Sequence, residues 1–207
     1  MIKIPELLAE LSLERPIFHS EADFQHALAW KIHSKHPGLN IRLERVFRNN
    51  NTNMNIDLFV VGNNFNVAVE LKYKTRGIAV VHNDERFLLA DQAAQDLGRY
   101  DFLKDIQRLE LLQNLSGCKG IAVFLTNDSA YWKPAKSVDV GYVEFCINEG
   151  ICLKGNLNWG SRAGDGTRRG REKAINLIGS YPMNWTDYSF VSTDRRSQFR
   201  YVFVEIL

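Results

Sequence analysis

Residues 54–73 read MNIDLFVVGNNFNVAVELKY, two apolar runs that are separated by the turn-forming residues GNN at 62–64. Glycine and asparagine tolerate a positive φ, which a tight turn between antiparallel strands requires. The second run, 65–73, alternates along its length, so that its apolar side chains share one face while Glu70 and Lys72 project from the other. This stretch therefore predicts a β-hairpin with charged side chains on one face.

The length of the turn decides which residues of the hairpin face each other. With a loop of two or four residues, opposed positions have numbers that sum to 127, so Asp57 lies across from Glu70, whereas a three-residue loop breaks this register. Opposed side chains lie ~4.5–5.5 Å apart at Cβ, and like charges there repel. A cation between the two carboxylates removes that repulsion, and oxygen ligands suit Mg²⁺ or Mn²⁺. Lys72, on the same face, could orient or deprotonate an attacking water, or neutralise charge on phosphorus.

The elements around the hairpin follow a definite order. Ser20 is a good N-cap for an amphipathic helix that ends before Pro37, and a strand at 41–47 comes next. After a polar loop, Asp91 can cap a long helix, and the apolar run GIAVFLT at 120–126 is typical of a buried central strand. The predicted order is helix, three strands, helix and strand.

The motif within this order resembles that of the PD-(D/E)xK nuclease superfamily. Ile56-Asp57 is followed across the hairpin by Glu70-Leu71-Lys72, and Ile56 stands where the name-giving motif has proline. The resemblance covers well over half of the chain. It implies an α/β protein with a restriction-endonuclease-like fold, in which helices flank a mixed central sheet in the core order αβββαβ.

The resemblance also implies roles for individual residues. Asp57 and Glu70 would bind Mg²⁺ or Mn²⁺ with help from the backbone carbonyl of Leu71, and Lys72 would act on the attacking water. Glu21 lies where many members carry another acid, although an acid in the first turn of a helix also favours the helix dipole. In some relatives polar residues of the second helix contact the substrate, and the candidates here are Gln92, Gln95 and Arg99.

The composition is that of one ordinary globular domain. The chain has 207 residues, 45% of them hydrophobic and 24% charged, and no segment long enough to be a linker, so we assign 1–207 to a single domain with its core at about 20–127 and a C-terminal extension at about 128–207. No apolar run approaches the ~18 residues of a membrane helix, and no secretory signal is evident. Three cysteines without a CxxC pair fit free thiols in a reducing cytoplasm, which is the expected location.

Binding to nucleic acid must depend on a local surface, because the net charge is only +2. Residues 155–173, which we call the basic segment, predict an exposed loop and a short helix between candidate strands at 141–147 and 198–206. The phosphate-binding candidates of this segment are Arg162, Arg168, Arg169, Arg171 and Lys173. A solvated loop is the alternative. Nearby aromatic residues could stack on bases or belong to the core, and these are Trp159, Tyr181, Trp185 and Tyr188.

The sequence thus predicts a magnesium-dependent nuclease that hydrolyses phosphodiester bonds, with DNA expected over RNA from the bias of the superfamily. A homodimer would provide two sites for the two strands of a duplex, and no membrane partner is expected. The alternative from another class is a non-catalytic nucleic-acid-binding or scaffold protein that retains the nuclease fold. The presence of all three motif residues argues against that alternative.

Overall fold

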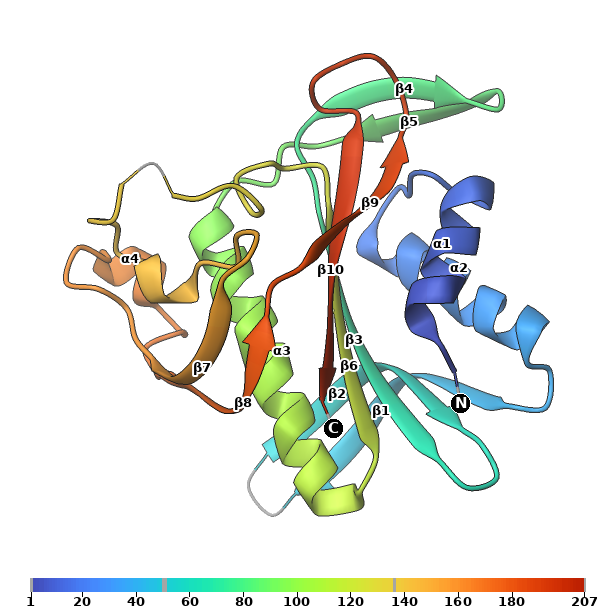
Figure 1. The fold of residues 1–207 in the computed structure, drawn as a ribbon, viewed down its shortest axis with the longest axis horizontal. Helices are drawn as coiled ribbons and strands as arrows, with labels where there is room; N and C mark the ends of the chain where they lie inside the picture. The colour runs from blue at the N-terminus through green and yellow to red at the C-terminus, as the bar shows by residue number, and fades with distance from the viewer. Residues whose placement is uncertain (1, 50–51, 136, 207) are drawn as a thin grey trace.

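The computed structural model describes residues 2–49, 52–135 and 137–206, which form an α/β structure around a mixed sheet of six strands (Figure 1). Within these residues, β3 and β6 are the parallel neighbours of the sheet, and its other neighbouring strands are antiparallel. The strands, in their spatial order, are β1 (Asn40–Asn49), β2 (Thr52–Val61), β3 (Asn66–Lys74), β6 (Lys119–Thr126), β10 (Gln198–Ile206) and β9 (Trp185–Phe190).

Helices cover both faces of this sheet. On one face α1 (Ile4–Glu14) and α2 (Glu21–Lys35) pack against a core that includes the apolar side of β3. On the other face lie α3 (Gln95–Ser116) and the hairpin of β7 (Cys152–Leu157) and β8 (Ile175–Pro182), which Figure 1 shows beside each other. Two separate cores therefore enclose the sheet, and charged residues of its inner strands are shielded from solvent on both sides.

The hairpin of β2 and β3 has the predicted register near its turn. Gly62 donates a backbone hydrogen bond to the carbonyl of Phe65 at 2.9 Å, which closes a two-residue turn. Leu58 pairs with Val69, and the two strands stay paired from there to the turn. The paired positions end at Leu58 and Val69, because β2 moves away from β3 just before Asp57. Asp57 and Glu70, which this register was expected to place opposite each other, therefore lie just beyond the last paired position and are not paired.

Strand β1 is distorted beside that point. Glu44 has a φ of 51°, a left-handed conformation that is uncommon for a residue with a side chain. It lies between two regular pairs of β1 and β2, those of Leu43 with Leu58 and of Arg45 with Ile56. The irregularity of β1 therefore lies next to Asp57, where β2 also leaves β3.

The two main helices begin differently. Ser20 caps α2 as predicted, since its hydroxyl accepts a hydrogen bond from the backbone N–H of Asp23. The prediction that Asp91 caps the long helix is wrong. That helix starts at Gln95, after Ala94 in a left-handed conformation, and the carboxylate of Asp91 instead accepts the N–H of Gly77 at 2.8 Å.

The segment between β3 and α3 contains a hairpin that the sequence did not predict, formed by β4 (Ile78–His82) and β5 (Glu85–Leu89). It stands at one end of the molecule, as Figure 1 shows. Asn83 and Asp84 form its turn, with φ of 49° and 64°. These two residue types adopt the left-handed conformation most readily after glycine, which explains the tight connection.

The last third of the chain is part of the main architecture. The predicted strand at 198–206 is confirmed as β10, which pairs with β6 and extends the central sheet. The predicted strand at 141–147 is wrong, because that region contains turns and the short 3-10 helix η1 (Val143–Phe145). Its apolar side chains Phe145 and Ile147 reach the core from irregular backbone.

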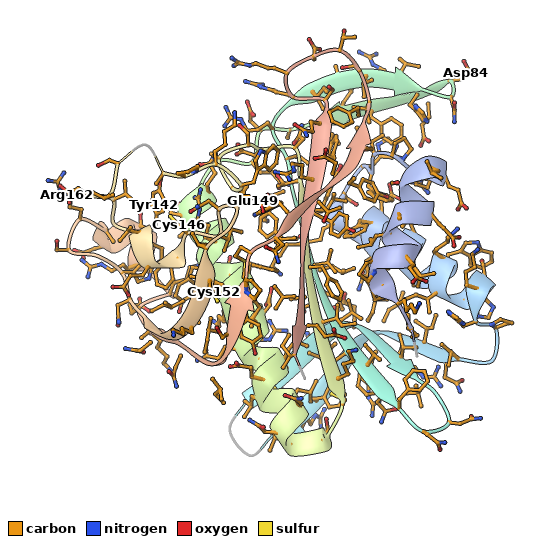
Figure 2. The ribbon with its side chains drawn as sticks, viewed as in Figure 1. Asp84, Tyr142, Cys146, Glu149, Cys152 and Arg162 are labelled. Atoms are coloured by element: carbon orange, nitrogen blue, oxygen red, sulfur yellow. The ribbon has the colours of Figure 1, made fainter. Side chains whose placement is uncertain are left out.

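Two further expectations concern environment. Among the residues that the structure describes, no helix is both long enough and apolar enough to cross a bilayer. All three cysteines are free thiols, and Cys152, labelled in Figure 2, is the exposed one.

Candidate active site

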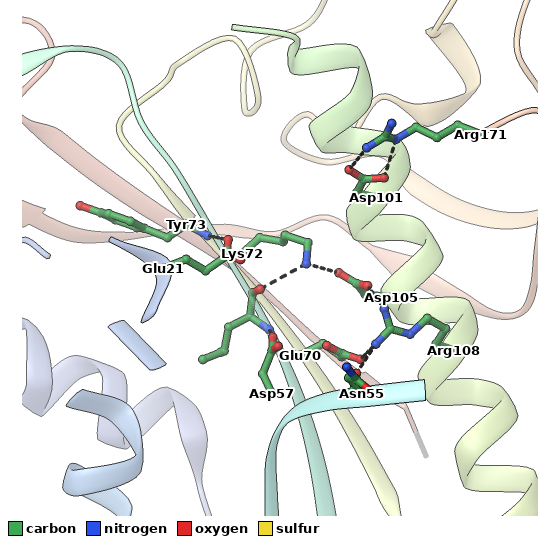
Figure 3. A network of polar contacts seen from close by, with 11 residues as sticks. Glu21, Asn55, Asp57, Glu70, Lys72, Tyr73, Asp101, Asp105, Arg108 and Arg171 are labelled. Atoms are coloured by element: carbon green, nitrogen blue, oxygen red, sulfur yellow. Dashed lines mark hydrogen bonds and ion pairs between the residues drawn. The ribbon is translucent and has the colours of Figure 1, made fainter. Parts of the chain in front are cut away.

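The candidate site forms where β2 leaves the edge of β3 (Figure 3). Two carboxylates take over the backbone groups that β2 no longer pairs. Oδ2 of Asp57 accepts the N–H of Leu71 at 2.6 Å, and Oε2 of Glu21 accepts the N–H of Tyr73 at 2.8 Å. The separation of β2 from β3 thus leaves two amides of β3 free, and Asp57 of β2 and Glu21 of α2 accept their hydrogen bonds. Without these acceptors the two N–H groups would be buried unpaired, which is costly.

The backbone of Asp57 is held by a neighbouring amide. Nε2 of Gln25, a buried residue of α2, donates to the carbonyl of Asp57 at 2.8 Å and to the carboxylate of Glu44 at 2.7 Å. One side chain of α2 therefore ties the distorted part of β1 to the residue at which β2 diverges. Gln25 and Glu44 are supports of the site that the sequence did not single out.

Glu70 and Lys72 face α3, on the side of the sheet opposite to the apolar residues of β3, as the alternation predicted. Glu70 is only 2% exposed. It forms an ion pair with Nη2 of Arg108, whose guanidinium also donates to the carbonyl of Asn55 and to Asp105. Arg108 thereby joins α3 to both β2 and β3 at the site.

Lys72 is paired with a second residue of α3. Its Nζ lies 2.7 Å from Oδ2 of Asp105 and 3.4 Å from the carbonyl oxygen of Leu71. Asp105 is 3% exposed, and its Oδ1 is 2.9 Å from Nη1 of Arg108. Asp105 therefore connects the two cations of the site, and Figure 3 shows both pairs on the side of α3 that faces β3.

A third ion pair lies on α3 one helical turn before Asp105. Arg171 of the basic segment contacts Asp101 through two hydrogen bonds of 2.7 and 2.8 Å. Asp101, Asp105 and Arg108 are separated by four and three positions, the spacing that places helical residues on one face. This spacing is the signal in the sequence that could have identified Asp105 and Arg108.

The site carries more acids than bases. Among the groups that contact β3 or lie on the face of α3 that carries Asp105, five carboxylates face three cations if every group is ionised, an excess of two negative charges. The carboxylates are Glu21, Asp57, Glu70, Asp101 and Asp105, and the cations are Lys72, Arg108 and Arg171. Burying unbalanced charge is unfavourable, so such a site should attract either protons or a cation.

The pKa values of the acidic groups reflect this excess. Burial raises the pKa of Glu70 to about 9, and the charge of Asp105 acts in the same direction while that of Arg108 opposes it. Burial also raises the pKa of Asp57, although the N–H of Leu71 works against the shift. The pKa of Asp105 is raised by burial as well. All three acids therefore bind protons more tightly than they would in water.

Lys72 remains positively charged in this setting. Burial favours its neutral form, but the charge of Asp105 and their hydrogen bond outweigh burial and raise the pKa of Lys72. A lysine whose pKa is raised is a poor acceptor of protons near neutral pH. Its ammonium group is suited to stabilising negative charge on a substrate, rather than to removing a proton from water.

The oxygen atoms of the site fit a hard divalent cation in type. Asp57, Glu70 and the carbonyl of Leu71 supply oxygen only, and Mg²⁺ typically takes one or two carboxylates and keeps several waters. Across the described ranges 2–49, 52–135 and 137–206, no three carboxylate, imidazole or thiolate groups converge as a ready-made cage. The set is thus compatible with a partly hydrated ion. Glu21, the further ligand that the resemblance implied, accepts the backbone N–H of Tyr73 through Oε2.

The three predicted substrate contacts near the start of α3 serve other purposes. Gln92 precedes the helix and accepts the N–H of Thr75, and Nε2 of Gln95 donates to Asp128 at 2.9 Å. Arg99 is buried against the rings of Tyr131 and Tyr142. The expectation that Arg99 reaches the substrate is therefore not supported, and Gln95 lies about 15 Å along the helix from Asp105.

The basic segment is only partly available to an anion. Arg171 holds Asp101, Arg168 lies 3.5 Å from Asp165, and Arg162 pairs with Asp139 at the periphery of the molecule (Figure 2). Arg169 and Lys173 are exposed, and the backbone carbonyl of Lys173 accepts the hydroxyl of Tyr100. A surface hollow of about 540 Å³ lies in this segment, and its lining residues are Asp165, Gly166, Arg168, Arg169 and Glu172.

The aromatic residues beside the basic segment belong to the core. Trp159 stacks on Tyr100 and donates its indole N–H to the carbonyl of Arg171 at 2.7 Å. The other three are buried and use their polar atoms internally, and these are Tyr181, Trp185 and Tyr188. Of the two alternatives for these rings, stacking on bases or a place in the core, the structure therefore supports the core, because their polar atoms are already engaged.

Comparison of the chain with protein-family models, with curated proteins and with solved structures gives no significant match. The chemistry of the site is therefore inferred from the contacts of its own residues.

Proposed function

We propose that this chain is a nuclease that hydrolyses DNA phosphodiester bonds with Mg²⁺ or Mn²⁺, on a restriction-endonuclease-like fold. The observation that supports it most is the meeting of Asp57, Glu70 and Lys72 at the point where β2 leaves β3. Their buried surroundings hold an excess of two negative charges if all groups are ionised. Because the pKa of Glu70 is raised to about 9, a proton neutralises part of that excess near neutral pH, and a divalent cation that displaces this proton would balance the charge. A solvated charged face would have no need of such an arrangement.

Different residues of the site would bind the ion and stabilise the charge on the substrate. Asp57, Glu70 and the carbonyl of Leu71 would hold the ion, which would act as a Lewis acid and lower the pKa of a bound water. The N–H of Leu71 fixes the orientation of the Asp57 carboxylate. Lys72, held by Asp105, would stabilise the negative charge that develops on the phosphoryl oxygens.

The basic segment would bind the nucleic-acid backbone beside the site. Its Arg171 already reaches the face of α3 that carries Asp105, so a strand that lies along this segment could continue to Lys72. Arginine side chains position phosphates without reading base sequence. This arrangement supports a substrate that is recognised chiefly through its backbone.

Cleavage assays test the proposal. Plasmid, linear duplex, single-stranded DNA and RNA would be incubated with wild type in Mg²⁺ and in EDTA. We expect metal-dependent cleavage of DNA, and a loss of at least ~100-fold in rate for Lys72→Ala. Lys154→Ala, at an exposed position of β7, is the matched control and should cleave as wild type does. Equal rates for Lys72→Ala and Lys154→Ala would refute the assignment of Lys72, and RNA-only cleavage would change the substrate.

A non-catalytic nucleic-acid-binding or scaffold protein is the second candidate. The ion pairs of Glu70 with Arg108 and of Lys72 with Asp105 favour it, since they neutralise part of the site without any ligand. In that case DNA binding would be independent of Mg²⁺, no substrate would be cleaved, and the ion would leave the melting temperature unchanged.

A further inference from the structure

Arg108 covers the carboxylate that the proposed metal site needs. Glu70 is 2% exposed, whereas the side chain of Arg108 is 30% exposed and its Nη2 forms the ion pair with Oε1 of Glu70. Figure 3 shows the guanidinium between Asp105, Glu70 and the carbonyl of Asn55. The guanidinium therefore occupies the position beside Oε1 of Glu70 that a bound cation would take.

Arg108 and a divalent ion cannot both occupy the same side of Glu70. Charge repulsion between two cations a few ångströms apart is strong where water is excluded. A buried carboxylate also gains most from the cation that contacts it directly. Ion binding at Glu70 therefore requires that Nη2 of Arg108 move away from Oε1.

The other contacts of Arg108 allow such a movement. Nη1 bonds to Oδ1 of Asp105 at 2.9 Å, and this contact does not involve Glu70, whereas the bond from Nη2 to the carbonyl of Asn55 would be given up together with the ion pair. The guanidinium can therefore release Glu70 and stay attached to α3. Lys72 competes less with the ion for its ligands, because its Nζ is held by Asp105 and lies 3.4 Å from the neutral carbonyl of Leu71.

We propose that Arg108 is a positioning residue that sets the affinity of the site for Mg²⁺ or Mn²⁺ by competing for Glu70. This inference rests on the proposed function, since it assumes that Glu70 is a ligand of the ion. It gives Arg108 one partner that it leaves when the ion binds, Glu70, and one that it keeps throughout, Asp105. The free energy needed to separate Arg108 from Glu70 lowers the affinity of the wild-type protein for the ion.

Titration with Mn²⁺, followed through the electron paramagnetic resonance signal of the free ion, tests the inference directly. Arg108→Gln should bind Mn²⁺ about tenfold more tightly than wild type, because a charged hydrogen bond no longer has to be broken. Arg42→Gln, which removes the same charge from an exposed position of β1, should bind as wild type does. The double variant Glu70→Gln with Arg108→Gln should lose the gain.

A second measurement uses the wild type, in case Arg108→Gln does not fold. Titration with Mg²⁺ should shift the side-chain NMR signals of Arg108, assigned with Arg108→Lys, and the shift should saturate with ion binding. The signals of Arg42 should stay in place.

The outcomes separate this inference from the proposed function. Equal affinity for Mn²⁺ in Arg108→Gln and Arg42→Gln, or Arg108 signals that ignore saturating Mg²⁺, would overturn the role of Arg108, while cleavage by wild type would still uphold the nuclease. The expected tightening without any cleavage would support the inference and remove the nuclease proposal. If none of these proteins binds Mn²⁺, both are overturned.

Discussion

The carboxylate of Asp57 accepts the backbone N–H of Leu71 at 2.6 Å, next to the last paired position of β2 and β3. The strand that carries Glu70 and Lys72 therefore orients Asp57 through its own backbone. A substitution of Asp57 can change the charge of the site and the fit between the strands separately, depending on which replacement is chosen.

Asp57→Asn should leave the protein as stable as wild type or more stable at pH 7.5 in EDTA. Burial raises the pKa of Asp57, so the ionised form is disfavoured in the folded state, and asparagine can still accept the N–H of Leu71. We expect a melting temperature higher by about 1–3 °C, measured by calorimetry. Asp57→Ala lacks the acceptor and should melt below wild type. A melting temperature for Asp57→Asn as low as that of Asp57→Ala would show that the negative charge itself stabilises the fold.

The stability of wild type should fall with pH relative to Glu70→Gln. The pKa of Glu70 is raised from 4.5 to about 9, so its stabilising contribution is complete below pH 4.5 and is lost as pH rises toward 9. Across this window the stability of wild type should decline against the variant by up to about 1.4 kcal/mol per pH unit. Urea denaturation in EDTA from pH 5 to 9 measures the difference, and parallel curves for the two proteins would contradict the shifted pKa.

Binding of Mg²⁺ should release protons. Glu70 must be ionised to act as a ligand, so the ion displaces a proton at any pH below about 9. Affinity should therefore increase by up to about tenfold per pH unit as pH rises from 6 to 8. Calorimetric titration in two buffers of different ionisation enthalpy gives the number of protons released. Identical heats in both buffers would mean that no acid of the site changes protonation.

The charge reversals Arg168→Glu and Arg169→Glu together should weaken binding to DNA and reduce its dependence on salt. Each lost phosphate contact lowers the slope of log affinity against log salt by about 0.9, so two contacts lower it by about 2. Fluorescence anisotropy with a labelled duplex at several salt concentrations measures both quantities. Lys154→Glu, on β7 outside the basic segment, controls for a general change of charge. An unchanged slope would make the basic segment a solvated loop.

Glu110→Gln should destabilise the protein by about 2 kcal/mol without affecting ion binding. Glu110 is buried and accepts the N–H groups of Ile178 and Gly179 and the hydroxyl of Tyr181, so it fastens β8 to α3. Tyr181→Phe removes one of these bonds and should cost about 1 kcal/mol. Urea denaturation of the three proteins provides the comparison. Equal stability of Glu110→Gln and wild type would mean that β8 is anchored by its apolar contacts alone.

Local patterns in the sequence were sufficient to predict the central hairpin. Alternation along β3 predicted which side chains share a face, and the observed register is one of those that the GNN turn allowed, because both depend only on neighbours in the chain. A similar turn signal was present but not used at Asn83-Asp84, where two left-handed residues join β4 to β5. That segment was predicted as a polar loop, although its strands have enough apolar residues to pair.

The residues that α3 contributes to the site could not be predicted from local patterns. Asp105 and Arg108 have the spacing of an ordinary solvated helix face, and only the packing of α3 against β3 turns that face inward. Arg99 is a plausible substrate contact from its position in the sequence, but it lies against the rings of Tyr131 and Tyr142, which are distant in sequence. Side chains whose partners come from other elements are specified by tertiary packing, which local periodicity does not contain.

The left-handed conformation of Glu44 also affects how this protein meets other chains. Strand β1 is at the rim of the sheet, and its apolar residues Leu43 and Val46 are exposed, which would make a straight strand a template for intermolecular pairing. The positive φ of Glu44 turns its N–H and carbonyl groups away from the regular row, so an incoming strand should pair poorly at this position of β1. We therefore expect the distortion beside Asp57 to reduce edge-to-edge pairing of the molecule as well.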